Sequence, residues 1–201
     1  MTTPAISELI VDPADACSAL SAALVANKPW ALRELLVDYR AYVARTLCRV
    51  LGPRSDLEDL VHDVFVRALE LTHRLNDREG IRPWIGAITV FIARETLQRQ
   101  RRRRWVFFMP DEDVPDCASR DASPEVVRAL NAAYALLRKL NTDEQIVFAL
   151  RYLDGRTLSE IAELVDCSLS TVKRRLERAD AAFFSRAKTD PWLAGWMEGN
   201  R

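Results

Sequence analysis

The chain has 201 residues, of which 49% are hydrophobic and six are glycine, and its 29 basic and 29 acidic side chains cancel to a formal net charge of zero. This length allows one large or two small domains with buried cores, and the scarcity of glycine and of alternating β-branched residues favours an all-α fold. No apolar run approaches the ~18 residues of a membrane span, and the N-terminus lacks the features of a secretion signal. Four widely spaced cysteines favour reduced thiols over a disulfide framework or a zinc site. We therefore predict a soluble intracellular protein without a metal or another cofactor.

Charge is unevenly distributed along the chain. Residues 29–109 hold 15 basic and 10 acidic side chains, residues 110–124 hold five acids against one arginine, and residues 125–187 are nearly balanced. An acidic segment with proline and serine between two apolar blocks is typical of a flexible linker. We predict two small helical domains, at 29–109 and 125–187, joined by the linker 110–124. Residues 1–28 are an N-terminal extension that is expected to be disordered, and residues 188–201 are a C-terminal tail.

Helix signals in the first domain are explicit. Apolar residues recur with a helical period from Trp30 to Leu51, and Gly52-Pro53 ends that helix. The sequence Ser55-Asp-Leu-Glu58 is a capping box that predicts a second helix to about Leu71. The polar stretch LTHRLNDREGIRP predicts a loop, and Pro83 within its last residues suits the first turn of a third helix. This third helix leads into the arginine run at 99–104.

The second domain begins at Ser123-Pro-Glu and contains two more capping boxes, Thr142-Asp-Glu-Gln145 and Thr157-Leu-Ser-Glu160. Between them, Gly155 can adopt the left-handed conformation that closes a helix. Two short helices follow, at about 158–165 and 169–185, with a tight turn at Asp166-Cys167. Aspartate tolerates the left-handed conformation that such a turn requires. The pair is a helix-turn-helix, whose second helix enters the major groove of DNA.

The second helix of this pair carries four cations within six positions, in the sequence STVKRRLER. Arginine or lysine can bond guanine in the groove, which is worth about 1–3 kcal/mol of discrimination per pair, and the other cations can neutralise phosphates. A basic helix face can also be merely solvated, but the capped helix-turn-helix around it favours DNA. The predicted contact set is Ser170, Thr171, Lys173, Arg174, Glu177 and Arg178.

The arrangement resembles the extracytoplasmic-function (ECF) sigma factors over about residues 29–187. LNTDEQIVFALRYLDGRTLSEIAELVDCSLSTVKRRLERA resembles their region 4, which reads the promoter −35 element. DLEDLVHDVFVRALEL resembles region 2.2, which docks on the clamp helices of the polymerase β′ subunit, and IRPWIGAITVFIARETLQRQRRRR resembles regions 2.3 and 2.4, which open and read the −10 element. The resemblance implies a bacterial, cytoplasmic, non-enzymatic sigma factor that binds promoter DNA and the β′ and β subunits of core RNA polymerase. Family members are often held by an anti-sigma factor, and nothing in these residues names one.

The resemblance also implies roles for individual residues. Asp59, His62 and Asp63 stand at polymerase-docking positions; without the resemblance they would be interpreted as the solvated face of an amphipathic helix. Asn76 and Asp77 stand in the loop that captures a flipped −10 base, whose extrusion costs a few kcal/mol. The other residues assigned to the −10 element are Arg82, Trp84, Arg99, Arg101, Arg102 and Arg103. For Trp84 a core position is the alternative, and for the arginine run it is a solvated helix end.

Several positions depart from the family pattern. Val90 and Phe91 stand where the family often has arginine and asparagine, so readout of the −10 element is expected to differ. Gly86 replaces a larger side chain inside a helix and costs about 1 kcal/mol relative to alanine. Cys167 is predicted to be a small core residue. In the tail, an apolar stripe that includes Trp192 and Trp196, with Leu193 and Met197, is predicted to pack on the second domain; the alternative is that it binds a separate regulator.

Two other classes of protein fit parts of the sequence. A stand-alone helix-turn-helix regulator would bind operator DNA by itself and use the first domain for sensing or dimerisation. It would not need the docking helix or the arginine-rich helix. An all-α adaptor would bind other proteins through its charged faces and show little salt-dependent affinity for DNA.

Overall fold

The computed structural model describes residues 13–75, 80–107, 124–190 and 193, and within these ranges the chain forms helices and turns with no strand. In chain order the elements are α1 (Pro13–Val25), α2 (Pro29–Leu51), α3 (Leu57–Glu70), the 3-10 turn η2 (Thr72–Arg74), α4 (Ile81–Phe107), α5 (Pro124–Leu137), α6 (Thr142–Phe148), the π-helical turn η3 (Ala149–Leu153), α7 (Leu158–Leu164) and α8 (Leu169–Ala187). The all-α prediction is confirmed.

The first half of the molecule is built from α2, α3 and α4, which all pack against one another. The helix α2 ends where predicted, because Gly52 adopts a positive φ of 83° and its N–H donates to the Cys48 carbonyl. A proline stands at the first position of α2. Leu35, Val43 and Leu47 are fully buried along one face of this helix. These three helices carry the residues predicted to dock on polymerase and those assigned to the −10 element.

The second half consists of α5 to α8, with α6 and α8 in extensive contact. An aromatic cluster of Phe148, Tyr152, Phe183 and Phe184 joins η3 and its neighbours to α8, with ring centroids 4.6 Å apart for Phe148 and Phe183. Leu193 is buried in this cluster's core, which agrees with the expected packing of the tail. The other three residues of the predicted stripe lie outside the described residues.

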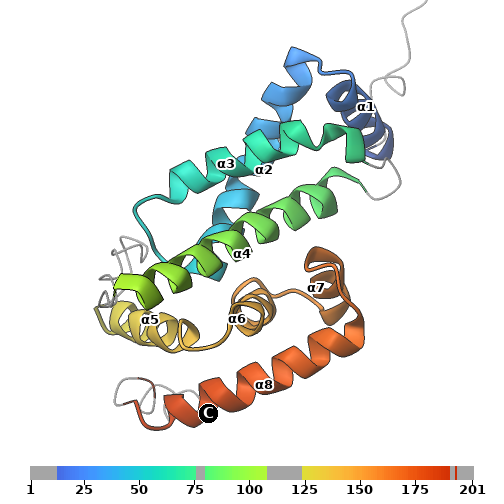
Figure 1. Ribbon diagram of the computed structural model, residues 1–201. Coiled ribbons are helices and arrows are strands. Elements are labelled where there is room, and N and C mark those ends of the chain that lie inside the picture. Colours follow the sequence, from blue (N-terminus) through green and yellow to red (C-terminus); the bar gives the residue numbers. More distant parts are fainter. Residues whose placement is uncertain (1–12, 76–79, 108–123, 191–192, 194–201) are drawn as a thin grey trace, which may run out of the picture.

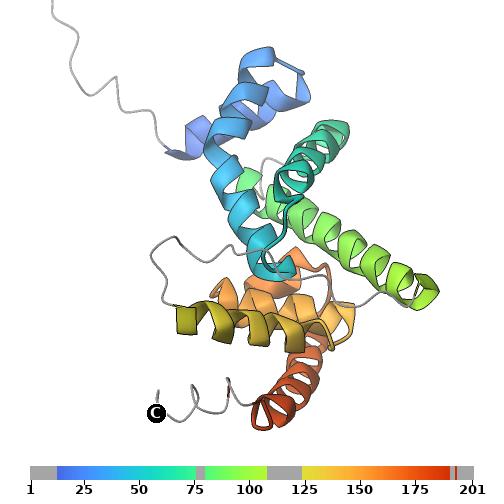
Figure 2. The same cartoon turned by 90° about the vertical axis from the view of Figure 1, so that its left-hand side faces the viewer.

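The two halves pack directly on each other. Figure 1 shows α4 between α3 on one side and α6 and α7 on the other, and Figure 2 shows the second half stacked beneath the end of α2. Buried residues from both halves form one continuous apolar core. The acidic segment predicted as a linker lies almost wholly outside the described residues, so the closeness of the halves is a finding that the sequence did not predict.

Two capping predictions need correction. Ser55 does not cap α3, because the helix begins at Leu57 with Asp56 at its N-cap and no side-chain cap bond. The Asp56 carboxylate instead pairs with Arg54, at 2.6 Å between Nη2 and Oδ2. At α6 the cap lies one residue earlier than predicted, since Asn141 accepts from the Glu144 N–H at 2.8 Å and completes a capping box with it.

Part of the N-terminal extension is helical, which corrects the expectation that this segment is disordered. Residues 13–25 form α1, which packs on α2 and η2. Leu20 and Leu24 bury their side chains in the continuous core. The missed signal is the apolar spacing of these leucines, in a stretch rich in alanine, the strongest helix former.

Candidate nucleic-acid interface and docking helix

The helix-turn-helix of the second half is held by its own caps. The Thr157 hydroxyl accepts from the Glu160 N–H at 3.2 Å, and the Glu160 carboxylate accepts from the Thr157 N–H at 2.8 Å, as the sequence predicted. Asp166 supplies the tight turn with a φ of 51°. Ser168 then caps α8 by accepting from the Thr171 N–H at 3.3 Å. Ile161 and Val172 are fully buried between the two helices, so the capped pair forms a rigid frame.

The predicted DNA-contacting residues lie on the outer side of α8. Lys173, Arg174, Glu177 and Arg178 are exposed, as is Ser170 at the start of the helix. The Ser170 and Thr171 hydroxyls both lie within 3.0 Å of the Ser168 hydroxyl, which orients the first turn of α8. This outer face of α8 therefore presents three cations and one acid to solvent.

The fourth cation of the run points the other way. Arg175 is half-buried, pairs with Asp143 of α6 at 2.7 Å and donates to the Cys167 sulfur at 3.7 Å. Cys167 is itself partly buried against the core, in agreement with its predicted role. The helical period thus divides one basic run into an outer set and an inner structural arginine.

Removing the cap of α7 gives a first testable result. Thr157→Ala is expected to lower the free energy of unfolding by about 1 kcal/mol, because it leaves the Glu160 N–H without its acceptor. Ser159→Ala is the matched control, since Ser159 is exposed within α7, and it should change stability by less than about 0.5 kcal/mol. Urea unfolding measures both; equal stabilities of the two variants would contradict the cap.

The same cap predicts a pH dependence. Hydrogen bonds from the Thr157 backbone and hydroxyl lower the pKa of Glu160 below its ordinary value. A carboxylate with a lowered folded-state pKa stabilises the fold above its unfolded pKa, and this contribution is lost as pH falls through the folded pKa. The stability difference between wild type and Thr157→Ala should therefore be largest at neutral pH and shrink below about pH 4. Urea titrations at pH 7 and pH 3.5 test this; a difference that is the same at both would refute it.

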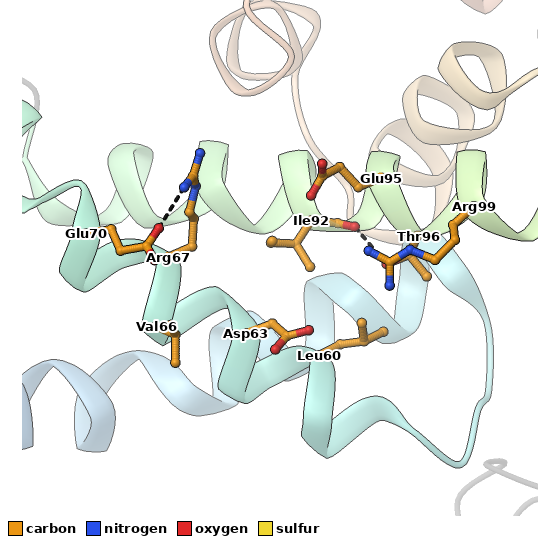
Figure 3. A pocket seen from close by; sticks show the side chains of 9 residues that line it. All are labelled: Leu60, Asp63, Val66, Arg67, Glu70, Ile92, Glu95, Thr96 and Arg99. Atoms are coloured by element: carbon orange, nitrogen blue, oxygen red, sulfur yellow. Dashed lines mark hydrogen bonds and ion pairs between the residues drawn. The ribbon is translucent and has the colours of Figure 1, made fainter.

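The second candidate site lies on α3. Asp59, His62 and Asp63 are exposed on this helix, and spacings of three and four residues place them on one face. Next to Asp63 is a shallow pocket of about 180 Å³ between α3 and α4. Figure 3 shows its lining: Leu60, Asp63, Val66, Arg67, Glu70, Ile92, Glu95, Thr96 and Arg99.

Exposed apolar side chains lie on the two helices that form this pocket, and one of them, Val66, lines it; none was predicted to belong to a site. Val66, Leu69 and Phe91 are each about two-fifths exposed. Arg67 places its guanidinium 5.9 Å from the centre of the Phe91 ring and pairs with Glu70 at 2.6 Å. An acidic face beside a partly apolar groove is a surface suited to another protein. The sequence signal for this surface is an apolar residue, Val66, on the side of α3 that the helical period predicts to face solvent.

The arginine run of α4 is divided in the same way as that of α8. Arg99, Arg102 and Arg103 are exposed or line the hollows along α4. Arg101 instead turns toward the second half, where it donates to the Leu140 carbonyl and lies 3.5 Å from the Gln145 side-chain oxygen. In this arrangement three of the four predicted phosphate contacts face solvent, and one is engaged within the protein.

The N-terminal end of α4 carries the other residues assigned to the −10 element. The Arg82 guanidinium lies 5.2 Å from the centre of the Tyr42 ring. Trp84 is half-buried and packs against the core, as its alternative interpretation expected. Asn76 and Asp77 lie outside the described residues.

The described part of the chain contains neither a metal-binding cluster nor a membrane-spanning helix. No group of three His, Cys, Asp or Glu side chains is close enough there to hold a metal ion. None of the described helices is long and apolar enough to cross a membrane.

Comparison with known proteins identifies the family. The family description "Sigma-70 region 2" matches residues 35–105, and "Sigma-70, region 4" matches residues 130–180. The ECF RNA polymerase sigma-E factor of Escherichia coli K12 is 26% identical over 163 residues, which cover 77% of this chain and 85% of that protein. The sigma-E factor of Haemophilus influenzae is 27% identical over 162 residues, covering 72% and 81%.

Solved structures share the fold. A structure of CnrH in complex with the cytosolic domain of CnrY matches with a TM-score of 0.58 and 20% identity, covering 93% of this chain and 100% of that chain. The sigma factor RpoE of Bartonella quintana, solved with the anti-sigma factor NepR, matches with a TM-score of 0.59 and 18% identity, covering 79% and 97%.

Both sigma regions occur on one chain, in the order that the sequence predicted. This chain belongs to the sigma-70 family, as a sigma factor of the ECF group. It therefore directs promoter-specific initiation by bacterial RNA polymerase. The match to sigma-70 region 2 argues against a stand-alone helix-turn-helix regulator, because such a regulator does not require that region.

Proposed function

We propose that this sigma factor docks on core polymerase through α3, with Asp59 and Asp63 as charged contacts and His62 as a hydrogen-bonding contact. The exposed acidic face beside the α3–α4 pocket carries this proposal. The expected partner is the clamp-helix coiled coil of the β′ subunit, whose basic side chains would pair with the carboxylates. Val66 and Phe91 would supply apolar contact beside them.

The second domain, residues 125–187, would read the −35 element as duplex. Lys173, Arg174 and Arg178 are the candidates for guanine and phosphate contacts, since their side chains are exposed on α8. Ser170 and Thr171 would orient the helix and contact the backbone. Glu177 can accept from a cytosine amino group.

The first domain, residues 29–109, would open and read the −10 element. Arg99, Arg102 and Arg103 would follow the phosphates, with Arg101 joining them when it leaves its contact with Leu140. Arg82 would hold the strand near the loop that contains Asn76 and Asp77. Trp84 is better suited to support this end of α4 than to stack on a base, because it is half-buried.

Partners other than the polymerase belong to the same proposal. One related structure, that of RpoE, contains an anti-sigma factor, which supports an anti-sigma partner for this chain. No catalytic role is proposed. The expected location is the bacterial cytoplasm, where polymerase and promoter DNA are.

Promoter mapping tests the proposal even though the sequence of the promoter is not known. Core polymerase would transcribe genomic DNA of the source organism with and without the protein, and the 5′ ends of the transcripts would be sequenced. The expected result is a set of start sites that requires the protein and shares two upstream elements. A Lys173→Ala/Arg174→Ala variant should lose these starts. Start sites identical with and without the protein would refute the assignment.

A further inference from the structure

The first turn of α8 begins with hydroxyl side chains that satisfy one another. The Ser168 hydroxyl accepts from the Thr171 N–H at 3.3 Å, and it lies 2.9 Å from the Thr171 hydroxyl and 3.0 Å from the Ser170 hydroxyl. A serine hydroxyl has one donor and two acceptor sites, so these three interactions use the whole capacity of Ser168. This hydroxyl therefore holds the backbone of the turn, as an N-cap does, and is not available to a base.

Next to this cap stands a leucine that the core does not use. Leu169 is the first residue of α8, it is 41% exposed, and it stands outside both apolar clusters of the described chain. Leu176, two turns further along α8, packs against the core instead. A single exposed leucine is ordinary on a protein surface, so its position in the fold decides what it can contact.

Leu169 occupies the part of a recognition helix that reaches base edges. In helix-turn-helix proteins the N-terminal residues of the second helix contact bases in the major groove. Leu169 precedes Lys173 by four residues, which places the two on the same side of α8, and Ser170 and Lys173 are both exposed beside it. Phe184, the other exposed large apolar residue of α8, is held in the aromatic cluster of the second half. Leu169 is thus the apolar side chain that α8 can present to the groove.

The major groove offers one favourable partner to an apolar side chain. The base edges present hydrogen-bonding nitrogen and oxygen groups there, and the C5-methyl group of thymine is the apolar exception. A leucine against a polar group would remove that group from water without replacing its hydrogen bond, which is unfavourable. Against the thymine methyl group, the leucine removes apolar surface of both partners from water, which is favourable.

We propose that Leu169 determines specificity within the −35 element by contacting the C5-methyl group of a thymine. The inference rests on the proposed function, because it requires α8 to lie in the major groove. Leu169 and Lys173 are about 6 Å apart along the helix axis, and successive base pairs are about 3.4 Å apart. The thymine therefore lies within about two base pairs of the pair that Lys173 contacts, on either strand. An A·T pair is selected there without a hydrogen bond to its edge.

Replacing single thymines by deoxyuridine tests this contact, because deoxyuridine lacks only the methyl group. The probes are labelled promoter duplexes with a mapped −35 element, each carrying one such replacement. They are titrated with core polymerase loaded with the full-length protein, and fluorescence anisotropy reports the affinity. Wild type should lose roughly fourfold in affinity at one thymine of the element, which corresponds to the burial of one methyl group.

The variant Leu169→Ala should no longer distinguish thymine from deoxyuridine at that position. It should bind the thymine duplex about as weakly as wild type binds the deoxyuridine duplex. A merely structural role of Leu169 would weaken binding to both duplexes equally and leave their ratio unchanged. Leu36→Ala is the matched control, because Leu36 is 43% exposed on α2, and it should retain the wild-type ratio. Circular dichroism checks that both variants retain their helices.

Two results would overturn the role of Leu169 and leave the proposed function standing. One is specific promoter binding by wild type that is insensitive to the methyl group of every thymine in the −35 element. The other is a Leu169→Ala variant that distinguishes thymine from deoxyuridine as well as wild type does. If the loaded polymerase binds no promoter duplex more tightly than core polymerase alone, the proposed function and this inference are both refuted.

Discussion

Asp63→Arg is expected to remove most of the binding of this sigma factor to core polymerase. Asp63 is exposed on α3 and borders the α3–α4 pocket, so a basic side chain there would face the basic partner that we propose. Removing one partner of a close charge pair at an interface costs about 2–5 kcal/mol, which corresponds to a loss of affinity of roughly 30-fold to several thousand-fold. Fluorescence anisotropy of the labelled protein titrated with core polymerase measures this loss.

The matched control is Glu163→Arg, because it changes the charge equally on α7 of the other half. It should bind core within about twofold of wild type. The Asp63→Arg variant should retain its affinity for a −35 duplex, since α8 is unchanged. Core affinity that is the same for Asp63→Arg and Glu163→Arg would refute the docking face.

Leu150→Ala is expected to have the largest effect on stability, about 2–5 kcal/mol. Leu150 is fully buried in η3 and belongs to the core that both halves share. Its truncation leaves a cavity where elements of both halves meet. Urea unfolding, followed by tryptophan fluorescence and by circular dichroism, measures the change.

Val37→Ala serves as the control, because Val37 is 72% exposed on α2 and should shift stability by less than about 0.5 kcal/mol. A single core predicts that both probes report one coincident transition for wild type. A loss below about 1 kcal/mol for Leu150→Ala, or two separate wild-type transitions, would contradict the shared core.

The local features of the fold could be predicted because they depend on neighbours in sequence. The left-handed conformation of Gly155 and Asp166, and the capping box at Thr157, occur as expected. The misplaced caps have local competitors. Arg54 draws the Asp56 carboxylate away from the start of α3, and Asn141 competes successfully with Thr142 because both are good N-cap residues.

The contact between the halves could not be predicted, because its pairs are distant in sequence. Arg49 and Asp154 are separated by 105 positions, and each alone is indistinguishable from a surface charge. For the same reason the sequence could not predict that Arg101 and Arg175 face inward while their neighbours in the two basic runs face solvent. Their partners are distant in sequence. Gly86 is an anomaly within α4 at the level of sequence, and its reason lies in the close approach to Leu164.

Run-off transcription from one mapped promoter, with core polymerase and with or without this protein, tests whether one chain couples polymerase docking to two promoter elements. A discrete transcript should therefore require the protein and disappear when five base pairs are inserted between the elements, because half a helical turn moves one element to the opposite face of the DNA. A transcript that persists after the insertion, or that forms without the protein, would contradict the claim.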